Sequence, residues 1–397
     1  MRQWIKKTEF RFGVLSGIQL LNILFPLALY LVLIDRLSLA IIGKITTWQM
    51  IFYILAGISS YSFPQNLIPI AEKLKSSAKT LACYWNTLLQ IRFLITSLVF
   101  VFVAIFAVYL PQVALFSSVL LLGRLFNPSS FFYVLSKNKL LLWYHFFTKL
   151  LSFVLVFFFI SNENWFVTNL FIGLSELLVA LFILIRIKWK ITFSALNLQK
   201  ATIYFKTDRK IFYIQLINML ILFITIPLTN LFFGAYIAGV VSILEKITSV
   251  IRGVSGNLFF TILPNFSSTK KEELLKGIQK SMAKISFFTL GLFLVSMVLL
   301  LFFKEDIIQK FEKEPMFYYV LTLMFVWFPI MISTPYQVVC LKLSLWKKIH
   351  FNSKTQLIVL ALGLILLGKL FGIWGIIASI ILHETVNYFL FRKAIKL

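Results

Sequence analysis

Apolar stretches recur along the whole chain, and charged residues, proline or glycine bound each of them. A helix that crosses a bilayer needs roughly 20 mainly apolar residues, so the pattern predicts one transmembrane helix for each stretch. We expect twelve such helices, approximately at residues 12–34, 41–62, 88–110, 113–135, 139–160, 164–186, 211–232, 236–258, 282–303, 317–338, 353–371 and 373–391. A polar, basic segment at residues 190–210 separates the sixth helix from the seventh.

The composition supports this interpretation. Of the 397 residues, 60% are hydrophobic and 13% are charged, and the mean hydropathy is +0.92. In a soluble domain about half of the residues are apolar and about a quarter are charged. Twelve crossings leave no room for a large water-soluble domain. We therefore expect an all-α polytopic membrane protein, and this excludes most classes of soluble enzyme.

Basic residues are distributed unevenly between the two sides of the predicted membrane. The chain has 39 Lys and Arg against 14 Asp and Glu, which gives a formal net charge of +25. Beginning at the N-terminus, alternate segments between helices hold 29 of these cations, and the opposite segments hold five. Lys and Arg mark the cytoplasmic side, so both termini are expected in the cytoplasm. The basicity is then a feature of topology, and no nucleic-acid partner is expected.

The two halves of the predicted bundle resemble each other. Four features of the first half recur in the second half in the same order: residues 18–22 with 214–218, Gly43 with Gly239, Pro128 with Pro335, and Glu176 with Glu384. Six helices in each half give both halves the same orientation in the membrane, which makes a parallel repeat. We expect two six-helix lobes, at residues 1–199 and 200–397.

Apart from the cations counted with the segments between helices, eight charged residues fall inside the predicted helices. They are Arg124, Lys149, Glu176, Glu245, Lys246, Arg252, Lys369 and Glu384. A charge that faces lipid at the bilayer centre costs on the order of 3 kcal/mol. These side chains are therefore expected to face a protein interior or a water-filled cavity. Five cations against three anions favour a cavity that accepts an anionic head group.

Ion pairing is the alternative explanation for the same residues. Glu245 and Arg252 are seven residues apart and share a helix face, and Lys149 and Glu176 form a second candidate pair. Lys369 lies near a helix end, from which its side chain is expected to reach the interface. His383 beside Glu384 indicates either a proton site or a histidine that packs between helices. The sequence contains no metal-ligand or nucleotide-binding motif, so no metal or cofactor is expected.

Several short motifs are familiar from one family. They are residues 20–43 with the glycine that opens the second helix, residues 61–65 (Tyr-Ser-Phe-Pro-Gln), residues 127–132 (Asn-Pro-Ser-Ser-Phe-Phe), residues 244–247 (Leu-Glu-Lys-Ile) and residues 372–375 (Gly-Ile-Trp-Gly). With the glutamates of the sixth and twelfth helices, they make the chain resemble Wzx-type O-antigen flippases. These belong to the polysaccharide transporters of the multidrug/oligosaccharidyl-lipid/polysaccharide (MOP) superfamily. The resemblance covers nearly the whole length.

The resemblance implies a MATE-like fold and a specific cargo. The cargo would be an undecaprenyl-pyrophosphate-linked oligosaccharide, moved across the bacterial inner membrane by alternating access for O-antigen or a similar surface polysaccharide. Membrane lipids and a polysaccharide polymerase would be partners, and a proton or sodium gradient would drive transport. The residues expected to bind the head group are Arg124, Lys149, Lys246 and Arg252. Those expected to serve in coupling or ion pairing are Glu176, Glu245 and Glu384.

Two other functions are compatible with parts of the pattern. An ion-coupled MATE-type exporter of drugs or small molecules would have the same helices, but cationic drugs favour an acidic cavity, whereas the predicted spans are net positive. A polymerase, ligase or acyltransferase would need a sizeable outer loop with catalytic residues. The longest predicted outer loop has about a dozen residues and neither His nor Ser. We therefore expect a transporter and not an enzyme.

Overall fold

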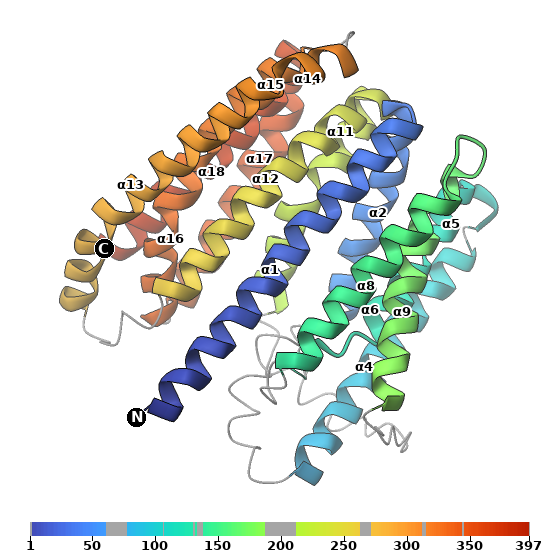
Figure 1. Ribbon diagram of the computed structural model, residues 1–397, viewed down its shortest axis with the longest axis horizontal. Coiled ribbons are helices and arrows are strands. Elements are labelled where there is room, and N and C mark those ends of the chain that lie inside the picture. The colour runs from blue at the N-terminus through green and yellow to red at the C-terminus, as the bar shows by residue number, and fades with distance from the viewer. Residues whose placement is uncertain are drawn as a thin grey trace. The chain divides into compact units, whose positions relative to one another are not determined.

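The computed structural model describes residues 2–60, 78–105, 107–129, 132, 138–186, 212–262, 271–311, 315–343 and 345–396. All regular structure in these residues is helical, and each of the twelve expected segments falls on helix, which confirms the fold class (Figure 1). Two compact units divide the chain, Met1–Pro227 and Leu228–Leu397. The expected boundary between the two lobes, at residues 199 and 200, lies outside the described residues and stays a prediction. The motif at residues 61–65 also lies outside them.

The first unit contains the helices of the first half of the sequence. They are α1 (Arg2–Arg36), α2 (Leu39–Ser60), α4 (Ala78–Ile105), α5 (Gln112–Ser117), α6 (Val119–Leu125), α8 (Asn138–Phe159), α9 (Thr168–Arg186) and a helix at Phe212–Phe223. Within this unit α1 packs along α8, and α9 packs against both α6 and α8. The helices near the candidate charges of this half, α6, α8 and α9, are thus direct neighbours.

The second unit contains the remaining helices, and α11 (Thr225–Phe233) crosses the division between the units. They are α12 (Ala235–Ile262), α13 (Lys271–Phe302), α14 (Lys304–Lys310), α15 (Met316–Leu323), α16 (Trp327–Lys342), α17 (Trp346–Phe371) and α18 (Ile373–Lys396). Here α18 packs along α17 and α16, and α16 also contacts α12 and α13. Gly372 connects α17 to α18 with a φ of 61°, a left-handed conformation that glycine adopts without strain.

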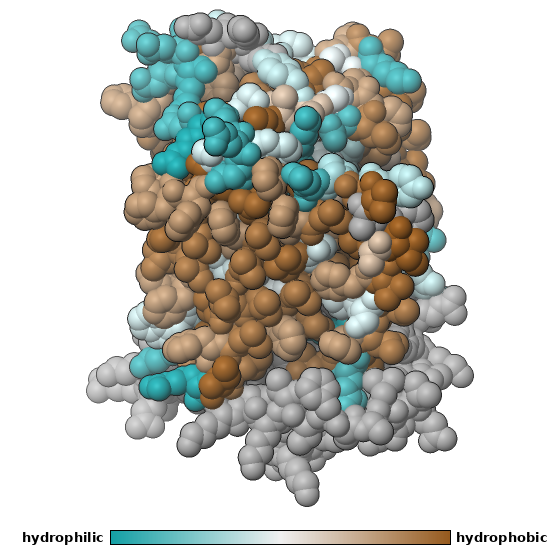
Figure 2. All heavy atoms as spheres, turned by 90° about the vertical axis from the view of Figure 1, so that its right-hand side faces the viewer, coloured by the Kyte–Doolittle hydropathy of each residue, from teal (hydrophilic) through white to brown (hydrophobic). Residues whose placement is uncertain are grey.

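The described helices have the dimensions and the polarity that a bilayer requires. Seven helical stretches among these residues are long and apolar enough to cross a membrane, and the bent pair Phe212–Phe223 with Thr225–Phe233 forms an eighth. On the face that Figure 2 shows, hydrophobic residues form a broad belt and hydrophilic residues gather beyond it. The chain is therefore a multi-pass membrane protein.

Two of the expected helices are broken within the membrane. In the fourth, α5 ends at Ser117 and α6 at Leu125. Beyond α6, the Oδ1 atom of Asn127 accepts a hydrogen bond of 2.9 Å from the backbone N–H of Ser129. In the seventh, the two parts meet at an angle of 50°. Hydropathy missed these breaks because the residues on both sides of each are apolar.

Three helices begin ten or more residues before their predicted positions: α1, which begins at Arg2 rather than near residue 12, and also α4 and α13. The helix α4 starts ten residues earlier than expected, at Ala78, and α13 starts at Lys271 rather than near residue 282. Both additional parts are polar, and α13 carries Glu272 and Glu273 in its first turn. Acidic residues stabilise the N-terminal end of a helix. Hydropathy marks only the apolar part of a helix, whereas backbone hydrogen bonding continues into the polar part.

A close approach of α6 to α9 positions the charged residues of the first unit. A Cβ atom added to Gly173 would lie 2.8 Å from the backbone N of Leu120, and one added to Gly123 would lie 2.7 Å from the Cβ of Glu176. Small residues permit such contact between membrane helices. The glycine before Arg124 and the glycine three residues before Glu176 therefore bring these two side chains together.

We predict that Gly173→Ala destabilises the protein by about 1–3 kcal/mol, because the added methyl group meets the backbone of α6 and neither helix can yield without moving. The matched control is Gly291→Ala on α13, where an added Cβ meets no atom within 4 Å. A helical Gly-to-Ala change in open space gains about 0.5–1 kcal/mol. Thermal unfolding of the detergent-purified protein measures both effects, and equal unfolding temperatures for the two variants would contradict the close packing.

Candidate functional site

An ion pair between α6 and α9 forms the centre of the charged cluster in the first unit. The Nε atom of Arg124 lies 3.2 Å from Oε2 of Glu176. Glu176 is buried, with 5% of its side chain exposed, whereas the Arg124 side chain is 39% exposed. Neither of these two atoms has a partner in hydrogen-bond geometry among the described residues, so the contact is electrostatic. Pairing with Arg124 explains how a glutamate is held inside a membrane span.

Aromatic and polar side chains of α2 contact the same guanidinium group. The centre of the Arg124 guanidinium lies 4.9 Å from the centroid of the Tyr53 ring, which is a cation–π distance. Gln49 donates a hydrogen bond of 3.3 Å to the hydroxyl of Tyr53. The ring of Phe223 lies 5.6 Å from that of Tyr53. Three helices thus fix the arginine, and sequence reasoning had identified neither Tyr53 nor Gln49.

Lys149, which the sequence suggested as an ion-pair partner of Glu176, does not form that pair. It is half-buried on α8 and interacts electrostatically with Glu176 and Arg124. No carboxylate of the described residues lies within ion-pair distance of its ammonium group. The partner of Glu176 is Arg124 instead, because the glycines bring α6 closer to α9. The cluster of Arg124, Lys149 and Glu176 holds two cations and one anion.

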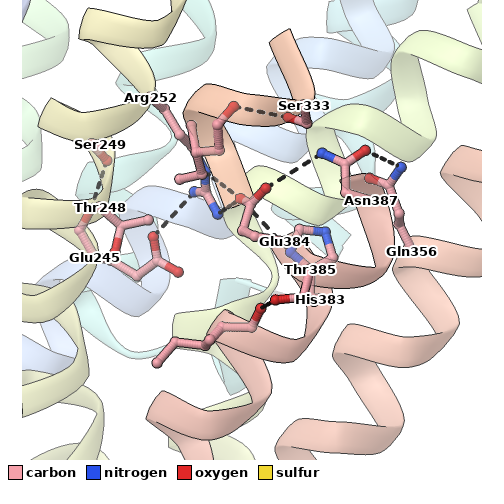
Figure 3. A network of polar contacts seen from close by, with 12 residues as sticks. Glu245, Thr248, Ser249, Arg252, Ser333, Gln356, His383, Glu384, Thr385 and Asn387 are labelled. Atoms are coloured by element: carbon pink, nitrogen blue, oxygen red, sulfur yellow. Dashed lines mark hydrogen bonds and ion pairs between the residues drawn. The ribbon is translucent and has the colours of Figure 1, made fainter. Parts of the chain in front are cut away.

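A different arrangement surrounds the corresponding glutamate of the second unit (Figure 3). Arg252 of α12 donates to Oε1 of Glu384 of α18 through Nε at 3.0 Å and through Nη2 at 2.9 Å. Its Nη1 donates to Oε2 of Glu245 at 3.4 Å. The Glu245–Arg252 pair was expected from the spacing of seven residues, whereas the bond to Glu384 was not. Arg252, Glu245 and Glu384 form a triad with one cation and two carboxylates.

Amide side chains extend the triad from α18 to α17. Asn387 donates to Oε2 of Glu384 at 3.4 Å, and Gln356 of α17 donates to Oδ1 of Asn387 at 2.7 Å. His383 is buried beside Glu384, with its Nδ1 atom 3.8 Å from Oε1. Neither nitrogen of this histidine has a hydrogen-bond partner among the described residues. The network therefore connects three helices of the second unit, as Figure 3 shows.

The remaining predicted cations lie elsewhere. Lys246 is half-buried on α12, about 100° around the helix from Glu245. Lys369 is exposed near the end of α17, and its Nζ lies 6.0 Å from the ring centroid of Phe232. Arg92, which is not among the eight intramembrane charges expected from the sequence, is buried within α4 with 5% of its surface exposed. It is a buried cation that hydropathy did not reveal.

The chemistry available at these clusters is electrostatic. No group of three or more His, Cys, Asp or Glu within the described ranges could hold a metal ion. Buried cations and carboxylates at the interior faces of apolar helices can bind a charged ligand, or can exchange partners when the helices move. The roles of Arg124, Lys149, Lys246 and Arg252 in binding remain predictions, as do those of the three glutamates in coupling.

No protein-family model matches the sequence, and no curated protein matches it either. Solved membrane-protein structures nevertheless share its fold. A multidrug resistance MATE family transporter of the MOP superfamily, in an inward-facing conformation, aligns with 97% of this chain and 94% of its own chain, at a TM-score of 0.64 and 14% identity. For the lipid II flippase MurJ, in an inward closed conformation, the coverages are 100% and 88%, the TM-score is 0.69 and the identity is 12%.

A eukaryotic MATE transporter shows the same likeness, with coverages of 99% and 95%, a TM-score of 0.61 and 14% identity. At such identities the likeness establishes the fold. The chain therefore has the two-lobed helical fold of the MATE transporters and MurJ, as the sequence resemblance implied.

We predict that Arg252→Met destabilises the protein by about 3–5 kcal/mol, since it leaves two buried carboxylates without their cation. Adding Glu384→Gln to this variant should recover part of the loss, because one buried charge is then removed. Arg124→Met is the matched comparison and should cost less, because Lys149 still offsets Glu176 and the Arg124 side chain is more exposed. Thermal unfolding of the three purified variants tests this order. An additive effect of the two changes in the double variant would contradict the pairing.

Proposed function

We propose that this protein is a transporter that flips lipid-linked oligosaccharide repeat units across the bacterial inner membrane by alternating access. The cargo class is an undecaprenyl-pyrophosphate-linked oligosaccharide of O-antigen or a similar surface polysaccharide. The observation that carries the proposal is the half-exposed Arg124 inside a membrane span, in a chain that shares its fold with a lipid II flippase. A cation in such a position suits an anionic lipid head group better than a neutral solute.

The energetics of the spans support an anionic cargo. A guanidinium group that faced hydrocarbon would be strongly unfavourable, so its exposed part requires water or a polar ligand. Arg and Lys are the side chains that bind phosphate oxygens most strongly, through charge-assisted hydrogen bonds. The sequence offers four candidates, Arg124 and Lys149 in the first unit and Lys246 and Arg252 in the second, and the contacts of each decide whether it is placed to bind. The oligosaccharide and the lipid tail need only loose accommodation.

We further propose that an ion gradient drives the cycle, with a proton or sodium ion as the coupling species. Glu384 is the main candidate for coupling, because it lies between Arg252 and His383. Glu176 and Glu245 are the other candidates. A side chain that can exchange one cationic partner for another provides the two alternative states that transport requires.

Deletion of the gene in the native host should reduce surface glycan and cause lipid-linked oligosaccharide to accumulate in the inner membrane, because the cytoplasmic leaflet no longer empties. Expression of the wild-type chain should reverse both effects. Surface glycan is measured by antibody or lectin staining of intact cells, and the precursor by mass spectrometry of extracted lipids. Unchanged glycan and precursor after deletion would contradict the proposed function.

In the same host, Lys149→Glu should abolish surface glycan, because charge reversal in a cluster with a net positive charge repels an anionic head group. Lys246→Glu should act in the same direction. The matched control is Lys369→Glu, at the exposed end of α17, which should leave glycan display close to the wild-type amount. Membrane expression is followed by immunoblot for every variant. Normal display with Lys149→Glu would contradict its assignment to the binding site.

The alternative function is an ion-coupled exporter of drugs or other small molecules, and the fold shared with MATE multidrug transporters favours it. An exporter of cationic drugs would raise the tolerance of host cells to a cationic dye such as ethidium. We expect no change in tolerance when this chain is expressed, because cations of the first-unit cluster repel such dyes. Increased tolerance together with normal surface glycan after deletion would favour the alternative.

A further inference from the structure

The two intramembrane arginines differ in how many of their donors are occupied. In Arg252 all three guanidinium nitrogens point at carboxylate oxygens, two at Glu384 and one at Glu245 (Figure 3). These contacts use three of the five N–H donors of the guanidinium group, on two of its sides. Its side chain is also only 20% exposed. Arg252 therefore uses most of its donors within its own unit.

Arg124 keeps most of its donors available. Among the described residues, its one ion-pair contact within 4 Å uses Nε, and the side chain of Tyr53 also interacts with the guanidinium group. The Tyr53 ring lies over the guanidinium, 4.9 Å from its centre. The side chain remains 39% exposed, about twice the fraction of Arg252. An open edge with two parallel N–H groups is the geometry that binds a phosphate in a bidentate manner.

The net charges of the two clusters also favour an anion in the first unit over the second. Arg124 and Lys149 face one carboxylate, that of Glu176, so the first-unit cluster has one positive charge in excess. Arg252 faces two carboxylates, so the triad has one negative charge in excess. An oxyanion is attracted to the first and repelled by the second. In a region of low dielectric, interactions of this kind are much stronger than in water.

We propose that Arg124 and Lys149 of the first unit bind a phosphate or pyrophosphate oxyanion, and that Arg252 does not bind it but holds α12 to α18. This inference rests on the proposed function and divides its candidate cations into two classes. Nη1 and Nη2 of Arg124 donate to the oxyanion, and Lys149 adds a second positive charge. Glu176 and Tyr53 are positioning residues that orient the guanidinium from its Nε side and from its face.

The test uses the full-length protein purified in detergent and farnesyl pyrophosphate as the probe, with calorimetric measurement of binding. Farnesol carries the same lipid without phosphate, and inorganic pyrophosphate carries the anion without lipid. Arg124→Gln and Lys149→Gln should each weaken binding of farnesyl pyrophosphate about tenfold or more, as expected for the loss of one charge-assisted contact. Farnesol should bind no more weakly to these variants than to the wild type.

Arg252→Lys is the decisive comparison. It keeps a cation between the two carboxylates, and it should bind farnesyl pyrophosphate within about twofold of the wild type, because Arg252 donates nothing to the probe. Lys369→Gln controls for the loss of a cation remote from the cluster. For Tyr53, binding should weaken with Tyr53→Leu and recover with Tyr53→Phe, which restores the ring. A thermal unfolding curve for each variant verifies that it is folded.

Several outcomes would overturn the inference. They are wild-type protein that does not bind farnesyl pyrophosphate, an Arg124→Gln variant that binds it normally, and a folded Arg252→Lys variant that loses as much affinity as Arg124→Gln. Inorganic pyrophosphate that competes with the probe supports the inference and identifies the anion as the determinant. Binding as described, in a protein whose deletion leaves surface glycan unchanged, would refute the proposed function and leave the oxyanion site standing.

Discussion

The constraint on which this structure depends is that an ionised carboxylate inside an apolar layer needs a cation within a few ångströms. Glu176 and Glu384 are both almost fully buried in helices whose other faces are exposed and apolar. Removing such a charge from water without compensation would cost several kcal/mol. Each glutamate therefore determines which helix must lie beside its own. In the first unit this is α6, whose glycine permits the approach, and in the second it is α12.

In the repeat expected from the sequence, Glu176 matches Glu384, but the arginines that pair with them do not match each other. The two glutamates occupy matching positions, at the sixth helix of each half. The arginine comes from the fourth helix of the first half and from the second helix of the second half. At matching positions stand the apolar residues Met331 and Ala56, so neither half contains the arginine of the other. The two halves thus satisfy the same electrostatic requirement by different contacts, and among the described residues Arg124 keeps more of its donors available than Arg252 does.

Sequence patterns predicted the helices far better than the contacts between them. Hydropathy located all twelve segments because the bilayer imposes the same length and polarity on each. It missed the break after α6, because the short polar run that begins at Asn127 lies between apolar stretches, and it missed the bend before Thr225, because apolar side chains continue across it. Glu245 and Arg252 were paired correctly because seven residues on one helix fix a shared face. The pairing of Glu176 with Arg124, and of Arg252 with Glu384, depends on how helices far apart in sequence are rotated and how closely they approach, which no single segment encodes. Tyr53 and Gln356 were missed for the same reason.

Arg124 and Arg252 differ in how many of their hydrogen-bond donors the protein itself uses. Under the proposed function, this difference suits them to two different tasks, binding a ligand and holding helices together. A side chain that contributes most of its donors to the protein stabilises one helix arrangement and offers few donors to a ligand. The Arg252 triad, extended by Asn387 and Gln356, accordingly holds α12, α18 and α17 as one body. A side chain with free donors gains hydrogen bonds only when the ligand arrives, so its contribution depends on the cargo. A ligand can shift a conformational equilibrium only by its differential affinity for the two states. Under the proposed function, the first-unit cluster is therefore the better candidate for coupling cargo binding to a change of conformation.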